Sequence, residues 1–284
     1  MSLLRFSNFE VYREFFDSNS GLFEGRWLWG QRLRQVTANS GRVEGWCGLC
    51  EAPSSFTYGG STDDEINLRE DLHCARCELN ARNRAALALL RECLPDAQAP
   101  VYATEQASPA FRWLRAHYPN AIGSEYFDDT SADRLQAYLR SLFDQDAQLR
   151  FEDATSLSFD DARFDALLTC DVLEHIPDYR AALAEFARVL KPGGHLILTV
   201  PFIDSQAQSI LRAEIDEDGN TIHHVEPEYH GDPVSPHGVL AYHTFAWDLL
   251  DAVRDAGFAN AEWCLPWRPD RGLFGTLWML HAGR

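Results

Sequence analysis

Residues 166–177 read ALLTCDVLEHIP, an apolar run that becomes polar at Asp171 and continues into a Leu-Glu-His-Ile-Pro turn. The apolar run predicts a strand that is buried on both faces of a sheet. Polar side chains such as Asp171, Glu174 and His175 are costly directly after such a strand unless they have partners or a ligand. The stretch therefore predicts either local partners or a bound ligand at the end of this strand.

Strand and helix patterns alternate around this stretch, from residue 101 onward. Strands are predicted at 101–105, 121–127, 149–153, 164–171 and 195–202, with a closing pair in AEWCLPW (261–267) and FGTLWMLHAG (274–283). Helices are predicted after the Ser108-Pro109 cap, over 131–143, after the Asp178 cap and over 244–258. The alternation predicts an α/β fold with a doubly wound, Rossmann-like, mostly parallel sheet of seven strands. Ligands on such sheets bind beyond the carboxyl ends of the strands.

Four of the seven cysteines form two CxxC pairs, CGLC and CARC. Two such turns aim four thiolates at one point and complete a closed, tetrahedral zinc site, which is structural rather than catalytic. The predicted ligands are Cys47, Cys50, Cys74 and Cys77. Disulfides and unpaired core thiols are the alternatives. The spacing of the two pairs and the lack of a recognisable secretory signal favour zinc.

The residues around the pairs predict a small module that precedes the sheet. A hairpin around Gly59-Gly60 separates the pairs, and a helix follows with one apolar face, formed by Ala86, Leu87, Leu90 and Leu94. A cysteine knuckle that leads into a helix resembles zinc-ribbon and treble-clef modules. The remaining cysteines are expected in the core: Cys93, Cys170 and Cys264.

Composition narrows the range of partners. The 284 residues carry 25 basic and 43 acidic side chains, a net charge of −18, which argues against a nucleic-acid partner. No apolar run is long enough to span a membrane, and no membrane partner is expected.

We expect a cytoplasmic protein with a helical arm at 1–45, the zinc module at 46–95 and a larger domain at 100–284. That domain has an insertion at 203–243.

The order of motifs resembles class I S-adenosylmethionine (SAM)-dependent methyltransferases of the bacterial small-molecule type. The resemblance covers about residues 100–284 and is most specific over 151–202, where DVLEHIP is followed by LKPGG and an apolar strand. LLDAVRDAGF (249–258) adds to it. The resemblance implies transfer of a methyl group from SAM to a small-molecule acceptor, at oxygen or nitrogen. The alternative is a non-catalytic protein of the same fold whose zinc module binds a partner.

The resemblance also implies cofactor-binding residues. Glu125 would accept hydrogen bonds from the ribose, Tyr126 would cover the adenine, and Asp153 with the Ala154 backbone would bind the adenine amine. Glu152 would replace Asp153 if the register differs by one residue. Asp171 would lie where methyl and acceptor meet. His175 would either line the SAM pocket or bind a neighbouring loop.

The first motif departs from the family because no glycine occurs between residues 101 and 122. Glycine normally lets the backbone of this turn approach the ligand. Glu105 would still bind the ammonium group of SAM, and the amide of Ala107 its carboxylate. The missing glycines also argue against a dinucleotide cofactor.

The insertion at 203–243 holds several groups that can take a proton. A histidine there could act as general base at neutral pH. The leading candidates for the group that takes the proton are Tyr229, His230 and His243. Alternatives are a second metal site or a solvated loop. The histidines and acids of its IHHVEPEYHGDPVSPHGVLAYH segment (222–243) are His223, His224, Glu226, Glu228, His230, Asp232, His237 and His243.

Overall fold

A computed structural model describes residues 3–58, 66–231 and 237–284. The chain forms two compact units, Met1–Cys93 with Glu262–Met279 and Leu94–Ala261 with Leu280–Arg284. The predicted Gly59-Gly60 turn and Asp232 lie outside the described residues. Among the helices that are described, none combines the length and the apolar character that a membrane crossing requires.

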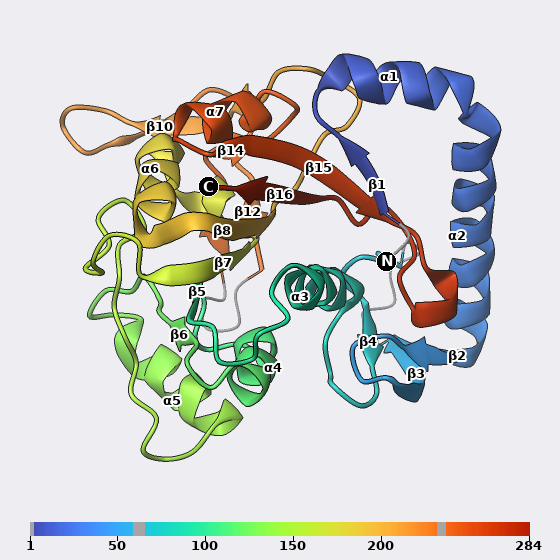
Figure 1. The fold of residues 1–284 in the computed structure, drawn as a ribbon, viewed down its shortest axis with the longest axis horizontal. Coiled ribbons are helices and arrows are strands. Elements are labelled where there is room, and N and C mark those ends of the chain that lie inside the picture. The colour runs from blue at the N-terminus through green and yellow to red at the C-terminus, as the bar shows by residue number, and fades with distance from the viewer. Residues whose placement is uncertain (1–2, 59–65, 232–236) are drawn as a thin grey trace. The chain divides into compact units, whose positions relative to one another are not determined.

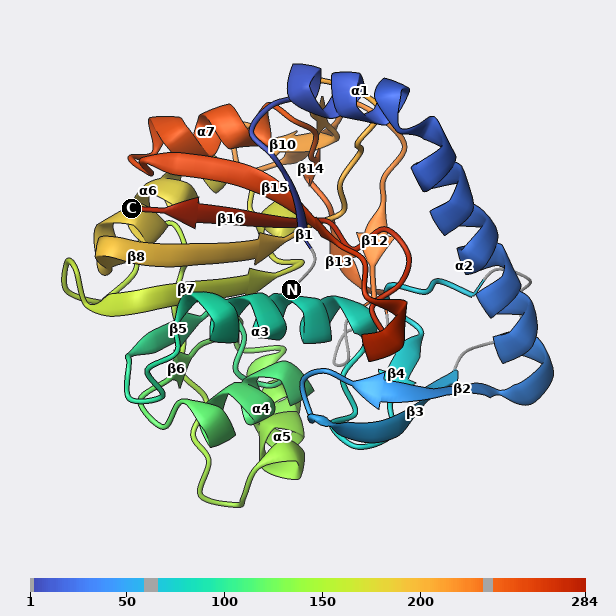
Figure 2. The same ribbon diagram turned by 45° about the vertical axis from the view of Figure 1, so that its right-hand side comes forward.

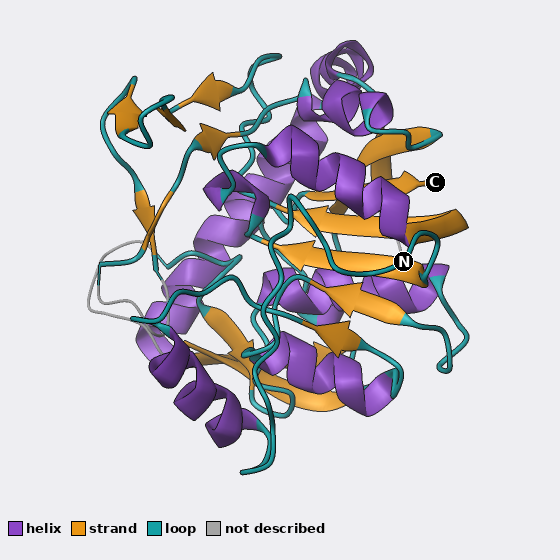
Figure 3. Ribbon diagram, turned by 90° about the vertical axis from the view of Figure 1, so that its left-hand side faces the viewer, coloured by secondary structure: helices purple, strands orange, loops and turns teal. Residues whose placement is uncertain are grey.

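The central sheet is mixed and has seven strands in the order β1-β15-β16-β8-β7-β5-β6 (Figure 1). Four neighbouring strands are parallel: β6 (Ile122–Gly123), β5 (Val101–Ala103), β7 (Phe164–Cys170) and β8 (Leu190–Thr199). β16 (Met279–Gly283) runs antiparallel to β8, and β15 (Asn260–Pro266) follows it in the order. Figure 3 shows helices around these strands. The Rossmann-like arrangement expected from the alternating pattern is confirmed.

The helices of the larger unit begin where their cap residues predict. Ser108 accepts a hydrogen bond from the Phe111 amide at the start of α4 (Pro109–His117). Asp178 accepts one from the Ala181 amide at the start of α6 (Tyr179–Val189). Each cap satisfies one of the amides that the first helical turn leaves without a partner. The other helices are α5 (Ala132–Leu142) and α7 (Leu249–Asp255), and α7 is shorter than the predicted helix over 244–258.

The predicted strand at 149–153 is wrong. This segment forms two isolated bridges, Phe151 with Glu125 and Asp153 with Ser156, and no continuous ladder. The amide of Arg150 donates 2.8 Å to the side-chain oxygen of Gln106, so a side chain takes the place of a ladder partner. The seventh strand is instead β1 (Leu3–Phe6), which pairs antiparallel with β15 and was not predicted. The expected number of strands is therefore reached with a different member.

The LKPGG segment ends α6 as expected but does not form a separate loop. β8 already begins at Leu190, and its register with β7 shifts between Phe164 and Ala166 to leave residues 191–194 out of the ladder. Gly193 has a φ of +82°, a conformation that favours glycine. Its amide donates 2.8 Å to the carbonyl of Arg284, which ties this bulge to the end of the chain.

The smaller unit contains a three-stranded antiparallel sheet. Its strands are β2 (Arg42–Cys47), β3 (Ala52–Tyr58) and β4 (Leu72–Cys74), and its helices are α1 (Phe9–Ser18), α2 (Ser20–Ser40) and α3 (Ala81–Cys93). Phe56 is only 1% exposed at its centre. A Cβ at Gly272 would lie 2.1 Å from this ring, so glycine is required where the turn η2 (Pro269–Arg271) ends.

The insertion at 203–243 folds into three short strand pairs rather than an irregular loop. The pairs are β10 (Ala213–Ile215) with β11 (Thr221–His223), β12 (Tyr229–His230) with β13 (Val239–Leu240), and β9 (Ile210–Leu211) with β14 (His243–Thr244). In Figure 2 the arrowheads of β7 and β8 point toward the side on which β12 and β13 lie. The insertion therefore lies at the carboxyl edge of the parallel strands.

Candidate functional site

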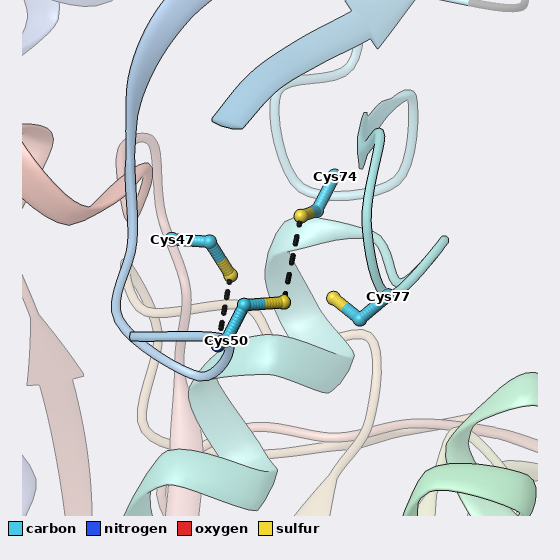
Figure 4. Close-up of side chains that lie close together, drawn as sticks. All are labelled: Cys47, Cys50, Cys74 and Cys77. Carbon is cyan, nitrogen blue, oxygen red and sulfur yellow. Dashed lines mark hydrogen bonds between the residues drawn. The ribbon is translucent and has the colours of Figure 1, made fainter. Parts of the chain in front are cut away.

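The four predicted cysteines converge at one point in the smaller unit. Their Sγ atoms all lie within 4.8 Å of one another, and Figure 4 shows the side chains pointing toward a common centre. Cys50 Sγ and Cys74 Sγ are 3.9 Å apart. A zinc–thiolate tetrahedron with bonds of about 2.3 Å has sulfur–sulfur edges of roughly 3.8 Å. The cluster therefore has the dimensions of a four-cysteine metal site.

The backbone around each pair has the same strained feature. Glu51 and Glu78, the residues directly after Cys50 and Cys77, have φ angles of +51° and +64°. Such angles are uncommon outside glycine and persist where the surroundings determine them. The Cys50 amide lies 3.4 Å from Cys47 Sγ, and the Arg76 amide lies 3.4 Å from Cys74 Sγ. Both turns thus bend so that amides face sulfur, as thiolate ligands require.

Arg84 supplies a positive charge next to the sulfurs. Its side chain is 1% exposed and lies 4.3 Å from the centre of the Phe56 ring. Burial lowers the pKa of Arg84, and the nearby Cys47, Cys77 and Cys74 sulfurs oppose that shift. A zinc ion with four thiolates carries a net charge of about −2, so a buried guanidinium is a fitting neighbour.

The glycine-free turn after β5 is held by Glu125. One carboxylate oxygen, Oε1, accepts hydrogen bonds of 2.7 Å from the amides of Gln106 and Ala107. Ala107 therefore donates to Glu125, and Ser108 caps α4. The structure thus brings Glu125 and Ala107 together, whereas the sequence predicted contacts of each with a different part of SAM.

The neighbouring strand β6 lets this turn pack closely against it, because a glycine lies at the point of contact. A Cβ at Gly123 in β6 would lie 2.6 Å from both the Glu105 carbonyl oxygen and the Phe111 ring. Any side chain there would push the turn and α4 away from the strand. The glycine that lets the backbone approach closely here thus lies beneath the turn, in β6, and not within it. Gly123 was not predicted as a site residue, because it lies outside the turn that it accommodates.

The two neighbouring acids Glu152 and Asp153 have different surroundings. Glu152 is 5% exposed and accepts hydrogen bonds from Ser158 and Arg150. Burial would raise the pKa of Glu152, but these hydrogen bonds lower it below its usual range. Asp153 Oδ1 accepts from the amide and hydroxyl of Thr155, which orders the turn that contains Ala154. Glu152 is therefore the internal residue of the pair.

Tyr126, the predicted adenine cover, is largely exposed. Its side chain is 73% exposed, and its ring centre lies 5.5 Å from that of Phe151. An exposed aromatic pair beside Glu125 offers an apolar surface to a flat ring.

Asp171 adopts a left-handed conformation at the end of β7, with a φ of +54°. Its amide donates 2.8 Å to the Thr199 carbonyl, and the Thr199 hydroxyl donates 2.9 Å to its Oδ1. Aspartate tolerates this conformation better than most residues, but it still costs energy. These two contacts are local partners of the kind that the sequence analysis required for Asp171.

Glu174 is fully buried, and the turn η1 (Leu173–His175) places it between two histidines. Its Oε1 lies 3.4 Å from His230 Nδ1 and 3.8 Å from His175 Nε2. His175 Nδ1 contacts the Leu240 carbonyl at 2.8 Å, so this histidine binds the insertion, as one of the two alternatives predicted. Glu174 and Glu228 raise the pKa of His230 above its usual range, against the effect of burial.

The other two predicted proton acceptors have different environments. His243 is buried, and its Nε2 lies 3.0 Å from the Pro177 carbonyl. Burial lowers the pKa of His243. Tyr229 is 56% exposed on the strand that carries His230. Glu174 was not assigned a role in the site, although the buried-strand signal that precedes it pointed to it, and Glu228 was named only in the alternative of a second metal site.

A cavity of about 630 Å³ in the larger unit lies elsewhere. Its lining includes Gln106, Gly123, Leu139, Phe143 and Arg150 but none of Asp153, Asp171, Glu174 or His175. It borders the turn after β5 from the side of α5. It therefore borders the first turn but not the groups that follow β7.

Residues 107–198 match the family model described as a methyltransferase domain. Short segments match curated relatives. A demethylmenaquinone methyltransferase of Bacteroides fragilis is 49% identical over 47 residues, which cover 16% of this chain and 19% of that protein. A ubiquinone biosynthesis O-methyltransferase of Alkalilimnicola ehrlichii is 48% identical over 40 residues, which cover 14% and 16%. The matches thus span less than a fifth of these relatives.

This chain is similar to two solved structures. A SAM-dependent methyltransferase from Mesorhizobium loti is 20% identical, with a TM-score of 0.48 and coverage of 73% of this chain and 100% of that chain. A SAM-bound amino pentose methyltransferase from Micromonospora echinaspora is 17% identical, with a TM-score of 0.48 and coverage of 74% and 94%. About a third of the chain, residues 107–198, thus matches the methyltransferase-domain family, and this segment contains Glu125, Asp153 and Asp171.

Proposed function

We propose that this protein is a SAM-dependent methyltransferase that acts on a small-molecule acceptor. The observation that carries the proposal is the match of residues 107–198 to the methyltransferase-domain family, within which a buried strand ends in the Asp171 turn. Ligands of doubly wound sheets bind at such strand ends. A cytoplasmic location and the absence of nucleic-acid and membrane partners belong to the same proposal.

On this proposal the cofactor lies across the ends of β5, β6 and β7. Glu125 holds the first turn through the amides of Gln106 and Ala107, and the ribose binds on its carboxylate. Tyr126 covers the adenine, and the ordered turn of Asp153 and Ala154 binds its amine. Glu105 binds the ammonium group. Methyl transfer is a direct displacement, so alignment of acceptor, methyl carbon and sulfur is the main task of these residues.

The acceptor lies on the side of Asp171 and the insertion. Among the three candidate proton acceptors, the contacts favour His230, because it lies 3.4 Å from the buried Glu174 carboxylate. His243 is engaged by the Pro177 carbonyl, and Tyr229 is exposed. His175 supports the insertion through Leu240. Selection of the acceptor then depends on the insertion, since the strand ends position only the cofactor.

The smaller unit is proposed to hold one structural zinc ion on Cys47, Cys50, Cys74 and Cys77, as a zinc-ribbon or treble-clef-like module. The convergence of the four Sγ atoms within 4.8 Å supports this. Once bound, the ion would stabilise the fold of this unit, because metal binding and folding are coupled in such modules. With four thiolates the coordination shell is closed, so no reaction step is assigned to it.

The test is SAM binding followed by product analysis. SAM at about 100 times its dissociation constant should add roughly 2.7 kcal/mol to the free energy of unfolding. Incubation with hydroxylated and amine-bearing small molecules should then release S-adenosylhomocysteine. SAM binding without any S-adenosylhomocysteine would favour different chemistry on the same fold. No stabilisation by SAM would reject the proposal in favour of a non-catalytic protein whose zinc module binds a partner.

A further inference from the structure

The side chain of Glu174 has no hydrogen-bond donor among the described residues, although it is fully buried. Its two oxygens together can accept about four hydrogen bonds. A buried carboxylate without donors is costly unless a positive charge neutralises it. The groups closest to it are two imidazole nitrogens, His230 Nδ1 at 3.4 Å and His175 Nε2 at 3.8 Å. Both distances leave space between the carboxylate and the rings.

The outer nitrogens of both histidines already have acceptors. His175 Nδ1 lies 2.8 Å from the Leu240 carbonyl, so Nδ1 carries the proton and Nε2, 3.8 Å from Glu174 Oε1, keeps a lone pair. His230 Nε2 lies 3.1 Å from Glu228 Oε1. Metal-binding histidines almost always donate their other N–H to a carbonyl or carboxylate in this way.

The outer contacts are themselves held by the insertion. Arg212 forms an ion pair of 3.1 Å with Glu228 Oε2 and also donates to the carbonyl of Glu226. The amide of Tyr242 donates 2.8 Å to the Glu174 carbonyl. The strand pair β12–β13 therefore delivers His230 and the Leu240 carbonyl to the turn after β7 as one unit.

We propose that Glu174, His175 and His230 bind a divalent first-row transition-metal ion. Their ligand atoms lie within 4.8 Å of one another. Two imidazoles and one carboxylate suit zinc, iron, manganese or cobalt, whereas magnesium and calcium prefer shells of oxygen. Three protein ligands leave coordination positions open. This site differs in kind from the closed four-cysteine cluster.

The role of the ion rests on the proposed methyltransferase function. An open position would accept a hydroxyl oxygen of the acceptor and lower its pKa, so that the proton passes to solvent. The resulting oxyanion would attack the methyl carbon of SAM. The new oxygen–carbon bond forms as the sulfur–carbon bond breaks, and S-adenosylhomocysteine leaves as a neutral thioether. The site therefore selects hydroxyl-bearing small molecules over amines.

Manganese(II) is the probe, because it binds oxygen and nitrogen ligands and avoids a thiolate cluster. The 284-residue chain, freed of loosely bound metal by a weak chelator, is titrated with Mn²⁺ while free Mn²⁺ is followed by electron paramagnetic resonance. One saturable Mn²⁺ per chain is expected. Glu174→Gln and His230→Ala should each weaken binding at least tenfold.

The matched control is His224→Ala. His224 also belongs to the insertion and lies 3.2 Å from a carboxylate oxygen of Glu214, but it is not part of the cluster. The His224→Ala variant should bind Mn²⁺ with the same affinity as the unchanged protein. Glu174→Gln removes a buried charge and keeps the shape of the side chain, so a folded variant remains available if His230→Ala unfolds.

The outcomes separate this inference from the proposed function, since the titration contains no SAM. Saturable Mn²⁺ binding that is lost in Glu174→Gln supports the metal site even if SAM fails to bind. Absence of saturable binding of both Mn²⁺ and Co²⁺ overturns the site, as does equal affinity in Glu174→Gln and His224→Ala. Failure of the metal titration would leave SAM binding unaffected. Failure of the metal site and failure of the proposed methyltransferase function are therefore distinguishable.

Discussion

The Glu125 carboxylate lies 2.7 Å from the Ala107 amide nitrogen, and the same oxygen accepts from Gln106. An acid that follows β6 thus orders the glycine-free turn after the neighbouring strand β5. The sequence assigned the Glu125 carboxylate and the Ala107 amide to different parts of SAM. In the structure these two groups are hydrogen-bonded to each other. The affinity for SAM and the order of this turn should therefore depend on one side chain.

Glu125→Ala should weaken SAM binding by about 1–3 kcal/mol, because the ribose hydroxyls and two partly buried amides lose their acceptor. It should also lower the melting temperature of the ligand-free protein. Glu125→Gln keeps an acceptor for the amides, so its melting temperature should fall less. Calorimetry and thermal unfolding measure the two effects. Unchanged SAM affinity in Glu125→Ala would reject the ribose assignment, and unchanged stability would reject the role of Glu125 in the turn.

Protein prepared without chelator should contain one zinc ion bound by the cysteine cluster, and Cys74→Ser should lower both zinc content and stability. The reason is that metal-ligand energy is folding energy in such modules. Elemental analysis and thermal unfolding measure this. Cys170→Ser is the control, since Cys170 lies in β7 and not among the four converging sulfurs. Zinc-free protein of undiminished stability would contradict the assignment.

Arg84→Met should lower stability most in the zinc-bound protein. The substitution keeps apolar contacts with Phe56 but removes the positive charge beside the cysteine cluster. A buried cluster with net negative charge then lacks its counter-ion, at a cost on the order of 3 kcal/mol. Chemical denaturation with and without zinc measures the difference. Equal losses in both forms would show that Arg84 acts through packing alone.

His230→Ala should reduce turnover by about 10²–10⁴-fold while SAM affinity stays within about threefold, because the residue acts on the acceptor side. The expectation holds whether His230 takes the proton itself or binds an ion that acidifies the acceptor. His224→Ala should retain turnover. His243→Ala should act mainly on stability, since its ring packs against Tyr179 and Phe245. Wild-type turnover in His230→Ala would place proton transfer elsewhere.

Glu152 should make stability depend on pH in the acid range. Its hydrogen bonds with Ser158 and Arg150 lower its pKa below the unfolded value of about 4.3. Its contribution is therefore fully present above that value and is lost as the pH falls through the folded-state pKa. Glu152→Gln should lower the melting temperature at pH 7 by on the order of 5 °C. The difference from the unchanged protein should shrink toward pH 3, and a constant difference would contradict this account.

Local signals in the sequence determined much of the fold. Ser108 and Asp178 cap the helices that they were expected to cap, because capping involves only residues three positions apart. The apolar run 164–171 forms the inner strand β7 within one residue. The CxxC spacing predicted four converging sulfurs, since each pair lies within a single tight turn. Strand-end acids likewise follow from a pattern that is local in the chain.

Tertiary structure decided the features that depend on partners distant in sequence. β1 joins the sheet only because β15, more than 250 residues later, presents an edge to it, whereas 149–153 pairs with Glu125 at a single bridge and the Arg150 amide binds the Gln106 side chain. Gly123 accommodates a turn that lies before it in the chain. Glu174, His175 and His230 meet because the strand pair β12–β13 carries His230 back across 55 residues to the end of β7. Such contacts form when side chains from separate elements share one buried space, and no local periodicity encodes that.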